Sequence, residues 1–423
     1  MSINSTKKEV LKSLLFRIAG IAFGFVATAI LLKNLGASTY GTWAALTSLL
    51  AWVQLSDFGV GYALKNRIAS APKTNEMLPL VSGVFQFYVL LSIAIAILFY
   101  VCANSLEIVR EHRAESLLLY LSAIMFFPLS IGSAVLQGLR KNSISSLMGL
   151  FQSFFWLGCV LIMVLGRPSL FSLSLMYVFT VLLIGVTQCI LGARVLVGNT
   201  GKGFSELLNF SNLSLAYPLW GVGLRFILLQ LSGVILFSLG TYLTYSYLSA
   251  EDAAKYDLLF KFFQLPLTFF NIIISVYWVE IARSIATRDR YLLQKKFLQL
   301  QLMALAISML ILLCACFLVS PLLAFYSGGL IHSSISDALA FWFLITVQIF
   351  SYAGAVFLNA AEKLRGQIIF AAVAAAMLIP TALIFYTKKL GFTAVPIATA
   401  LLILPSLFYC NWAAYHHVIK KVC

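Results

Sequence analysis

Apolar runs of about twenty residues recur along almost the whole chain, and they restrict its fold more than any other feature. A helix rises 1.5 Å per residue, so about 20 apolar residues cross the roughly 30 Å hydrocarbon core of a bilayer. Of the 423 residues, 61% are hydrophobic and only 10% are charged, too few to cover the surface of a soluble domain. The sequence therefore predicts an all-α integral membrane protein with about twelve transmembrane helices. The predicted spans are residues 14–34, 41–63, 79–103, 117–139, 144–166, 172–193, 219–243, 257–280, 298–319, 337–361, 367–387 and 394–415.

Lysine and arginine are distributed unevenly between alternate loops. The even-numbered loops and both termini hold 21 of them, the odd-numbered loops hold 7, and Lys261 lies inside a span. Because basic residues favour the cytoplasmic side, this bias predicts that both termini are cytoplasmic. The net charge of +15 is scattered over short loops without a basic domain, so we expect membrane lipids and no nucleic acid as partners.

The two halves of the sequence resemble each other weakly. Arg17 precedes an apolar run and then LGASTYGTW, and Arg225 precedes a similar run and then YLSAEDAAKYDLL. Six helices per half would give two bundles of equal orientation around a central cavity. We predict an N-terminal six-helix bundle at residues 1–200 and a C-terminal one at residues 201–423.

Asp57 is the acid inside the second predicted span. A carboxylate at such a depth costs about 2.5–3.5 kcal/mol on insertion scales, so it should face protein or water rather than lipid. It could orient a cation, bind a coupling proton or pair with Arg17. Alternatively, it is an acid near the inner interface that is hydrogen-bonded for structure.

Three cations are candidate substrate-binding residues. Arg17 and Arg225 stand near cytoplasmic helix ends, where they either fix topology or form the mouth of a cationic vestibule for phosphate. Lys261 either lines the path or extends its stem to the interface. Counted against Asp57, these three leave an excess of positive charge that favours an anionic cargo.

Two stretches resemble a known family. The pattern LGxxxYGxW followed by DFGVGxxLKNRIA, at residues 35–69, is similar to the second transmembrane helix of O-antigen and polysaccharide flippases. These belong to the superfamily that includes the multidrug and toxin exporters. Residues 223–237 and 247–263 resemble their seventh and eighth helices. The flippases have an acid at the place of Asp57 and a lysine at that of Lys261.

The resemblance implies a flippase that moves an isoprenoid-pyrophosphate-linked oligosaccharide to the periplasmic leaflet by alternating access. It also implies a bacterial inner membrane location, with the polymerase and chain-length regulator of the pathway as candidate partners. One alternative is a multidrug or cation antiporter of the same fold. The flippases often have a Thr-Asp pair where residues 238–240 here read Ser-Leu-Gly, so a role for that acid does not carry over. The missing acid and Lys261 argue against the antiporter, which should have acids in its carboxyl-terminal cavity.

A membrane glycan polymerase is the other alternative. Such enzymes typically have one large external loop with polar chemistry, and no external loop here exceeds about 17 residues between the predicted spans. The seven cysteines form no CxxC with paired histidines, so no metal site is predicted. We therefore expect no enzyme activity and no cofactor.

Overall fold

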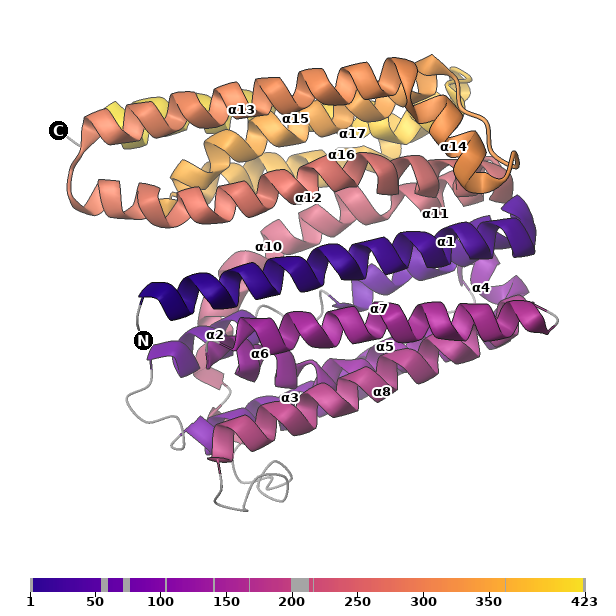
Figure 1. Ribbon diagram of the computed structural model, residues 1–423, viewed down its shortest axis with the longest axis horizontal. Helices are drawn as coiled ribbons and strands as arrows, with labels where there is room; N and C mark the ends of the chain where they lie inside the picture. Colours follow the sequence, from indigo (N-terminus) through magenta and orange to yellow (C-terminus); the bar gives the residue numbers. More distant parts are fainter. Residues whose placement is uncertain are drawn as a thin grey trace. The chain divides into compact units, whose positions relative to one another are not determined.

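The computed structural model describes residues 3–54, 60–70, 77–102, 105–139, 141–166, 168–198, 213–215, 217–361 and 363–420. Side chains within these ranges are not described at residues 3–11, 51–54, 217–227 and a few single positions. The described chain is helical and contains no strand (Figure 1). Its helices are α1 (Ile3–Gln54), α2 (Val60–Ser70), α3 (Leu78–Cys102), α4 (Glu107–Glu111), α5 (Arg113–Leu129), α6 (Ile131–Gly138), α7 (Asn142–Leu165), α8 (Leu170–Val197), α10 (Tyr217–Ser238), α11 (Gly240–Tyr247), α12 (Ala250–Ala286), α13 (Arg290–Phe317), α14 (Val319–Ser327), α15 (Ile335–Ala360), α16 (Arg365–Thr387) and α17 (Ala394–Ala413), with short η6 (Gly391–Thr393) and a terminal π-helix, η7 (Ala414–Ile419).

Helix α1 contains two predicted spans. Gly36 interrupts it with a φ of 78° and a ψ of 168°, a conformation that glycine adopts without a Cβ clash. The first span lies before this break, and the second begins after it and resumes in α2 beyond residues 55–59. Two helical segments of α1 thus meet in a kink at Gly36, where the sequence predicts the loop between the first two spans.

The remaining predicted spans also coincide with helices or helix pairs. Among the described residues, nine helices are long and apolar enough to cross a membrane, and α10 with α11, bent by 45°, passes the same test as a pair. The predicted span at 117–139 is divided between α5 and α6, next to Pro128, whose ring removes a backbone donor. These observations, together with the two predicted spans in α1, confirm the prediction of an all-α membrane protein with about twelve spans.

Backbone contacts divide the chain into two compact units. Unit 1 comprises Met1–Thr39 and Leu49–Ile227, and unit 2 comprises Tyr40–Ser48 and Leu228–Cys423. The short segment Tyr40–Ser48 of α1 therefore packs with the second unit although the chain on both sides of it belongs to the first. The predicted boundary between residues 200 and 201 stays a prediction.

Within unit 1, α8 packs against α5, α6 and α7, and α2 packs against α6. Its core includes Val60, Leu64 and Ile68 of α2 together with Val81 and Val84 of α3. In unit 2, α15 is the central helix and contacts α12, α13 and α17. Figure 1 shows these four helices of unit 2 running along a common direction.

Large apolar side chains cover much of the outside of the protein. Leu165 is 88% exposed, Phe325 81% and Phe317 73%. In water such a surface would drive association, whereas in a bilayer it faces lipid tails. Together with the long apolar helices, this surface makes the chain a multi-pass membrane protein.

Candidate functional site

The amino-terminal end of α12 has a well-defined cap. The Ser249 hydroxyl accepts a hydrogen bond from the Asp252 backbone N–H at 3.0 Å, which satisfies a donor that the helix itself cannot pair. Glu251 and Asp252 place negative charge in the first turn, where it interacts favourably with the positive end of the helix dipole. The cap fixes the start of α12 and hence the register of Asp257 and Lys261.

Gly41 brings a second element against this end of α12. A Cβ built on Gly41 would lie 1.7 Å from the Ala250 carbonyl oxygen, a distance that no side chain permits. The absence of a side chain therefore allows the segment 40–48 to approach the backbone of α12 closely. This approach places Tyr40 beside Asp257.

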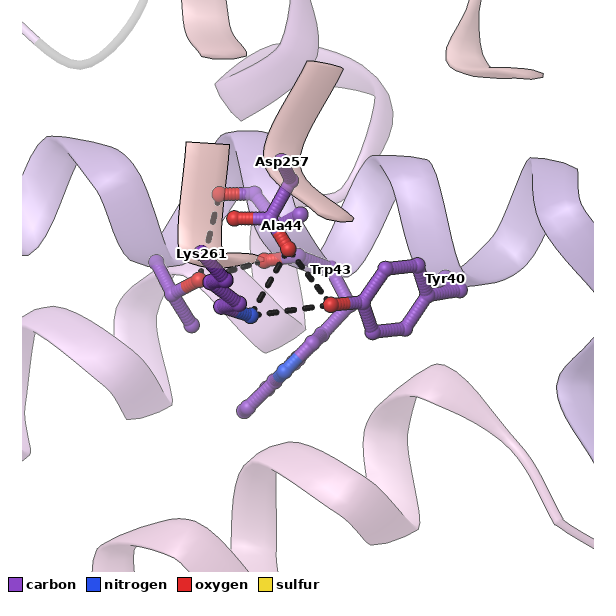
Figure 2. A network of polar contacts seen from close by, with 6 residues as sticks. Tyr40, Trp43, Ala44, Asp257 and Lys261 are labelled. Atoms are coloured by element: carbon purple, nitrogen blue, oxygen red, sulfur yellow. Dashed lines mark hydrogen bonds and ion pairs between the residues drawn. The ribbon is translucent and has the colours of Figure 1, made fainter. Parts of the chain in front are cut away.

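Tyr40, Asp257 and Lys261 form a closed hydrogen-bonded triad within unit 2 (Figure 2). The Tyr40 hydroxyl donates to Asp257 Oδ2 at 2.5 Å, and Lys261 Nζ donates to the same oxygen at 2.7 Å. Lys261 Nζ also donates to the Tyr40 oxygen at 2.9 Å. Figure 2 shows Trp43 and Ala44 of the same segment next to the triad.

The triad balances its own charges. The Asp257 side chain is 13% exposed and that of Lys261 is 41% exposed, so the acid is enclosed and the lysine reaches solvent or lipid. Bonds to a charged carboxylate are stronger than those between neutral groups. The charge count made from the sequence omitted Asp257. The unbalanced positive charge that it assigned to Lys261 is therefore wrong. The Asp–Lys spacing of four residues on a predicted helix was the signal that would have revealed the pair.

Arg17 lies in unit 1 near α7. Its Nε donates to Ser146 Oγ at 3.4 Å, and Ser13 Oγ lies 2.6 Å from the same hydroxyl. Lys65 of α2 donates to Gln137 Oε1 at 3.3 Å. Burial lowers the pKa of Lys65 from its ordinary value, and the positive charge of Arg17 lowers it further. Two cations are thus close enough to repel each other in this unit.

The other two predicted site residues cannot be placed in the same way. Asp57 lies outside the described residues, so its pairing with Arg17 stays a prediction. Arg225 lies on α10, and its side chain is outside the described part. The structure therefore locates Arg17 and Lys261 in separate units and leaves the roles of all four untested. Within the described part of the chain, no group of three or more His, Cys, Asp or Glu could hold a metal ion.

Comparison with known proteins identifies the fold. No family model and no curated protein matches the sequence. Among solved structures, an inward-facing multidrug resistance MATE family transporter of the MOP superfamily matches with a TM-score of 0.78 and 13% identity, over 97% of this chain and 99% of that chain. The chain has the MATE transporter fold.

Further structures of this fold agree with that match. An outward-facing multidrug resistance MATE family transporter of the MOP superfamily has a TM-score of 0.64 at 14% identity, over 99% of this chain and 96% of that one. A MATE in the straight conformation has a TM-score of 0.65 at 14% identity, over 98% and 97%. At this identity the comparisons establish the MATE fold alone.

Proposed function

We propose that the chain is a membrane transporter that works by alternating access. The observation that carries the proposal is the match to the MATE fold along practically the whole length of both chains. Solved structures of that fold include one inward-facing and one outward-facing transporter. Both of these structures are described as transporters, which supports transport without bond chemistry.

Export of small organic molecules is the first candidate for the cargo. The similar structures are described as multidrug resistance transporters, and this description supports such a cargo better than any other. The test is expression in a bacterial host that lacks its own efflux pumps. Multidrug export predicts lower ethidium accumulation and higher resistance than with an empty vector, and unchanged accumulation would contradict it.

A lipid-linked oligosaccharide is the second candidate, and the neutralised triad favours it. A cationic drug needs an accessible acid, whereas Asp257 already binds Lys261 at 2.7 Å. Glu280, the other acid in the predicted span at 257–280, pairs with Lys296. Arg17 of unit 1, near α7, carries the kind of positive charge that a pyrophosphate would require. The pathway's polymerase and chain-length regulator are the partners that this reading implies.

The two candidates give opposite results in one host. A strain without its own flippase should regain surface glycan if the chain moves lipid-linked oligosaccharide, and lipid-linked repeat units should stop accumulating. An organic-cation exporter would leave the glycan absent and lower ethidium accumulation. On either reading we place the chain in a bacterial inner membrane with both termini in the cytoplasm.

A further inference from the structure

One face of α12 carries polar side chains along the length of a membrane span. These residues are separated by four, three, four, three and four positions, and at 100° per residue they lie within an arc of about 80°. From first to last they extend about 27 Å along the helix, close to the roughly 30 Å of a hydrocarbon core. The six residues of this polar face are Asp257, Lys261, Gln264, Thr268, Asn271 and Ser275.

Two neighbouring helices of unit 2, α15 and α13, pack on the side of α12 away from the polar face. Phe263 stacks on Phe341 of α15 with ring centroids 5.9 Å apart, and Tyr256 meets the same ring edge to face at 5.3 Å. Near the carboxyl-terminal end of α12, the Tyr277 hydroxyl donates a hydrogen bond to Gln299 Oε1 of α13 at 3.5 Å. The helical positions of these contacts turn the polar face away from α13 and α15. Asn271 and Ser275 are accordingly exposed.

Hydrogen bonding separates two kinds of side chain on this face. Thr268 and Ser275 donate to carbonyls of their own helix, at 2.9 and 2.7 Å. Within the described part of the chain, the side chains of Gln264 and Asn271 make no hydrogen bond. Elsewhere in unit 2 an amide pair does join helices, since Gln301 Nε2 donates to Asn411 Oδ1 at 2.6 Å. Amides turned to lipid would lose their hydrogen bonds at a cost in free energy, so this face requires water or a polar ligand.

We propose that the polar face of α12 is a binding surface for the uncharged, hydroxyl-rich part of a cargo, that is, for carbohydrate. The inference rests on the proposed transport function and names the class of ligand that this face takes. Amide groups both donate and accept hydrogen bonds, as sugar hydroxyls do. The face has no net charge because Lys261 balances Asp257, so it offers no free carboxylate to an organic cation.

An aromatic side chain continues the face by one turn. Trp278 follows Asn271 by seven residues, which places it on the same side of α12, and it is 42% exposed. Its indole offers a flat apolar surface against which the C–H face of a sugar ring packs. Gln264, Asn271 and Trp278 therefore provide the polar and apolar contacts that a pyranose requires.

Thiol labelling tests whether the face meets water. Gln264→Cys and Asn271→Cys, in a chain with no other cysteine, are treated in membrane vesicles with a hydrophilic methanethiosulfonate. Phe269→Cys is the matched control, because Phe269 lies on the apolar side of α12 and is 47% exposed. We expect Asn271→Cys to react at least about tenfold faster than the control, since thiolate forms in water and not in lipid. Equal rates would overturn the inference.

Protection by ligands tests the class. Maltotriose at about 100 mM should slow the labelling of Asn271→Cys at least about twofold by occupying the face, while ethidium should not. Protection by ethidium alone, or by neither compound, would overturn the assignment to carbohydrate. If Asn271→Cys is not labelled in a chain that still exports cargo, this inference alone is overturned. If Asn271→Cys is labelled and maltotriose protects it in a chain that exports nothing, the proposed transport function alone is overturned.

Discussion

Asp257 and Lys261 are four residues apart on α12, and each neutralises the charge of the other. The acid is the more enclosed partner and accepts hydrogen bonds from both Lys261 and Tyr40. Removing the lysine leaves an enclosed carboxylate without its counter-charge, whereas removing both charges leaves a neutral pair. The two outcomes differ in stability because an uncompensated charge costs more than the pair contributes.

We predict that Lys261→Met destabilises the protein by about 1–3 kcal/mol, with a discount for the partial exposure of the lysine. The double variant Lys261→Met, Asp257→Asn should recover at least about half of this loss. Unfolding in detergent, followed by circular dichroism, measures both effects. If the loss in the double variant equals the sum of the losses in Lys261→Met and in Asp257→Asn, the ion pair is not coupled.

Lys65 supplies a second prediction at this scale. Its pKa is lowered first by burial and then by Arg17. Because the folded-state pKa lies below the unfolded one, this group favours the folded state more as the pH rises through the folded pKa. Arg17→Gln should raise the pKa of Lys65 part of the way to its ordinary value. The pH dependence of Lys65 acetylation, read by mass spectrometry, measures the shift.

Arg67→Gln is the control for this prediction. Arg67 lies two residues from Lys65 and is not among the causes of its pKa shift. The control should leave the pKa of Lys65 where it is. A pKa that stays unchanged in Arg17→Gln as well would show that the two cations do not interact.

At the scale of elements, the contact between segment 40–48 and α12 depends on Gly41. A Cβ at this position would meet the backbone of Ala250 and Ala254, which cannot move as a side chain can. Gly41→Ala should therefore separate the two elements and break the bonds from Tyr40. Gly24→Ala is a matched control on the same helix, since nothing lies within 4 Å of a Cβ there.

We predict a loss of about 2 kcal/mol or more in Gly41→Ala, as overpacking costs typically 1–3 kcal/mol. Gly24→Ala should be neutral or stabilising by about 0.5–1 kcal/mol, because alanine favours a helix over glycine. Thermal unfolding in detergent compares the two variants. Equal stability would mean that the close approach at Gly41 is not needed.

The elements themselves were largely predictable, because length and hydropathy alone define a transmembrane helix. Each of the twelve predicted spans coincides with a helix or a helix pair. The break at Gly36 and the division near Pro128 depend on single residues whose local conformation a hydropathy pattern does not specify.

The candidate site was predicted less well. Lys261 was recognised, but its partners were not, because Tyr40 is 217 residues from Asp257 in sequence. Only packing brings them together. Asp257 itself escaped notice because it lies at the first position of a predicted span, where an acid resembles a cap residue. The local Asp–Lys spacing would have identified half of the triad.

For the whole molecule, the orientation in the membrane is the first prediction. The bias of basic residues places the loop after α4 outside and the loop between α12 and α13 inside. Alkaline phosphatase fused after His112 should be active and green fluorescent protein there dark. Fusions after Asp289 should behave in the opposite way. A reversed pattern would invert the topology and the direction of the proposed export.

Alternating access is the central claim, and it requires that the two ends of the molecule open in turn. Spin labels at Ser169 of unit 1 and Ser336 of unit 2 report on one predicted side of the membrane. Labels at Asn142 of unit 1 and Arg288 of unit 2 report on the other. Double electron–electron resonance of each pair, in lipid nanodiscs, is the most direct measurement. We expect two distances for each pair, with the population of the long distance at one side equal to that of the short distance at the other. A single distance at both sides, unchanged by pH or by cargo, would contradict the account.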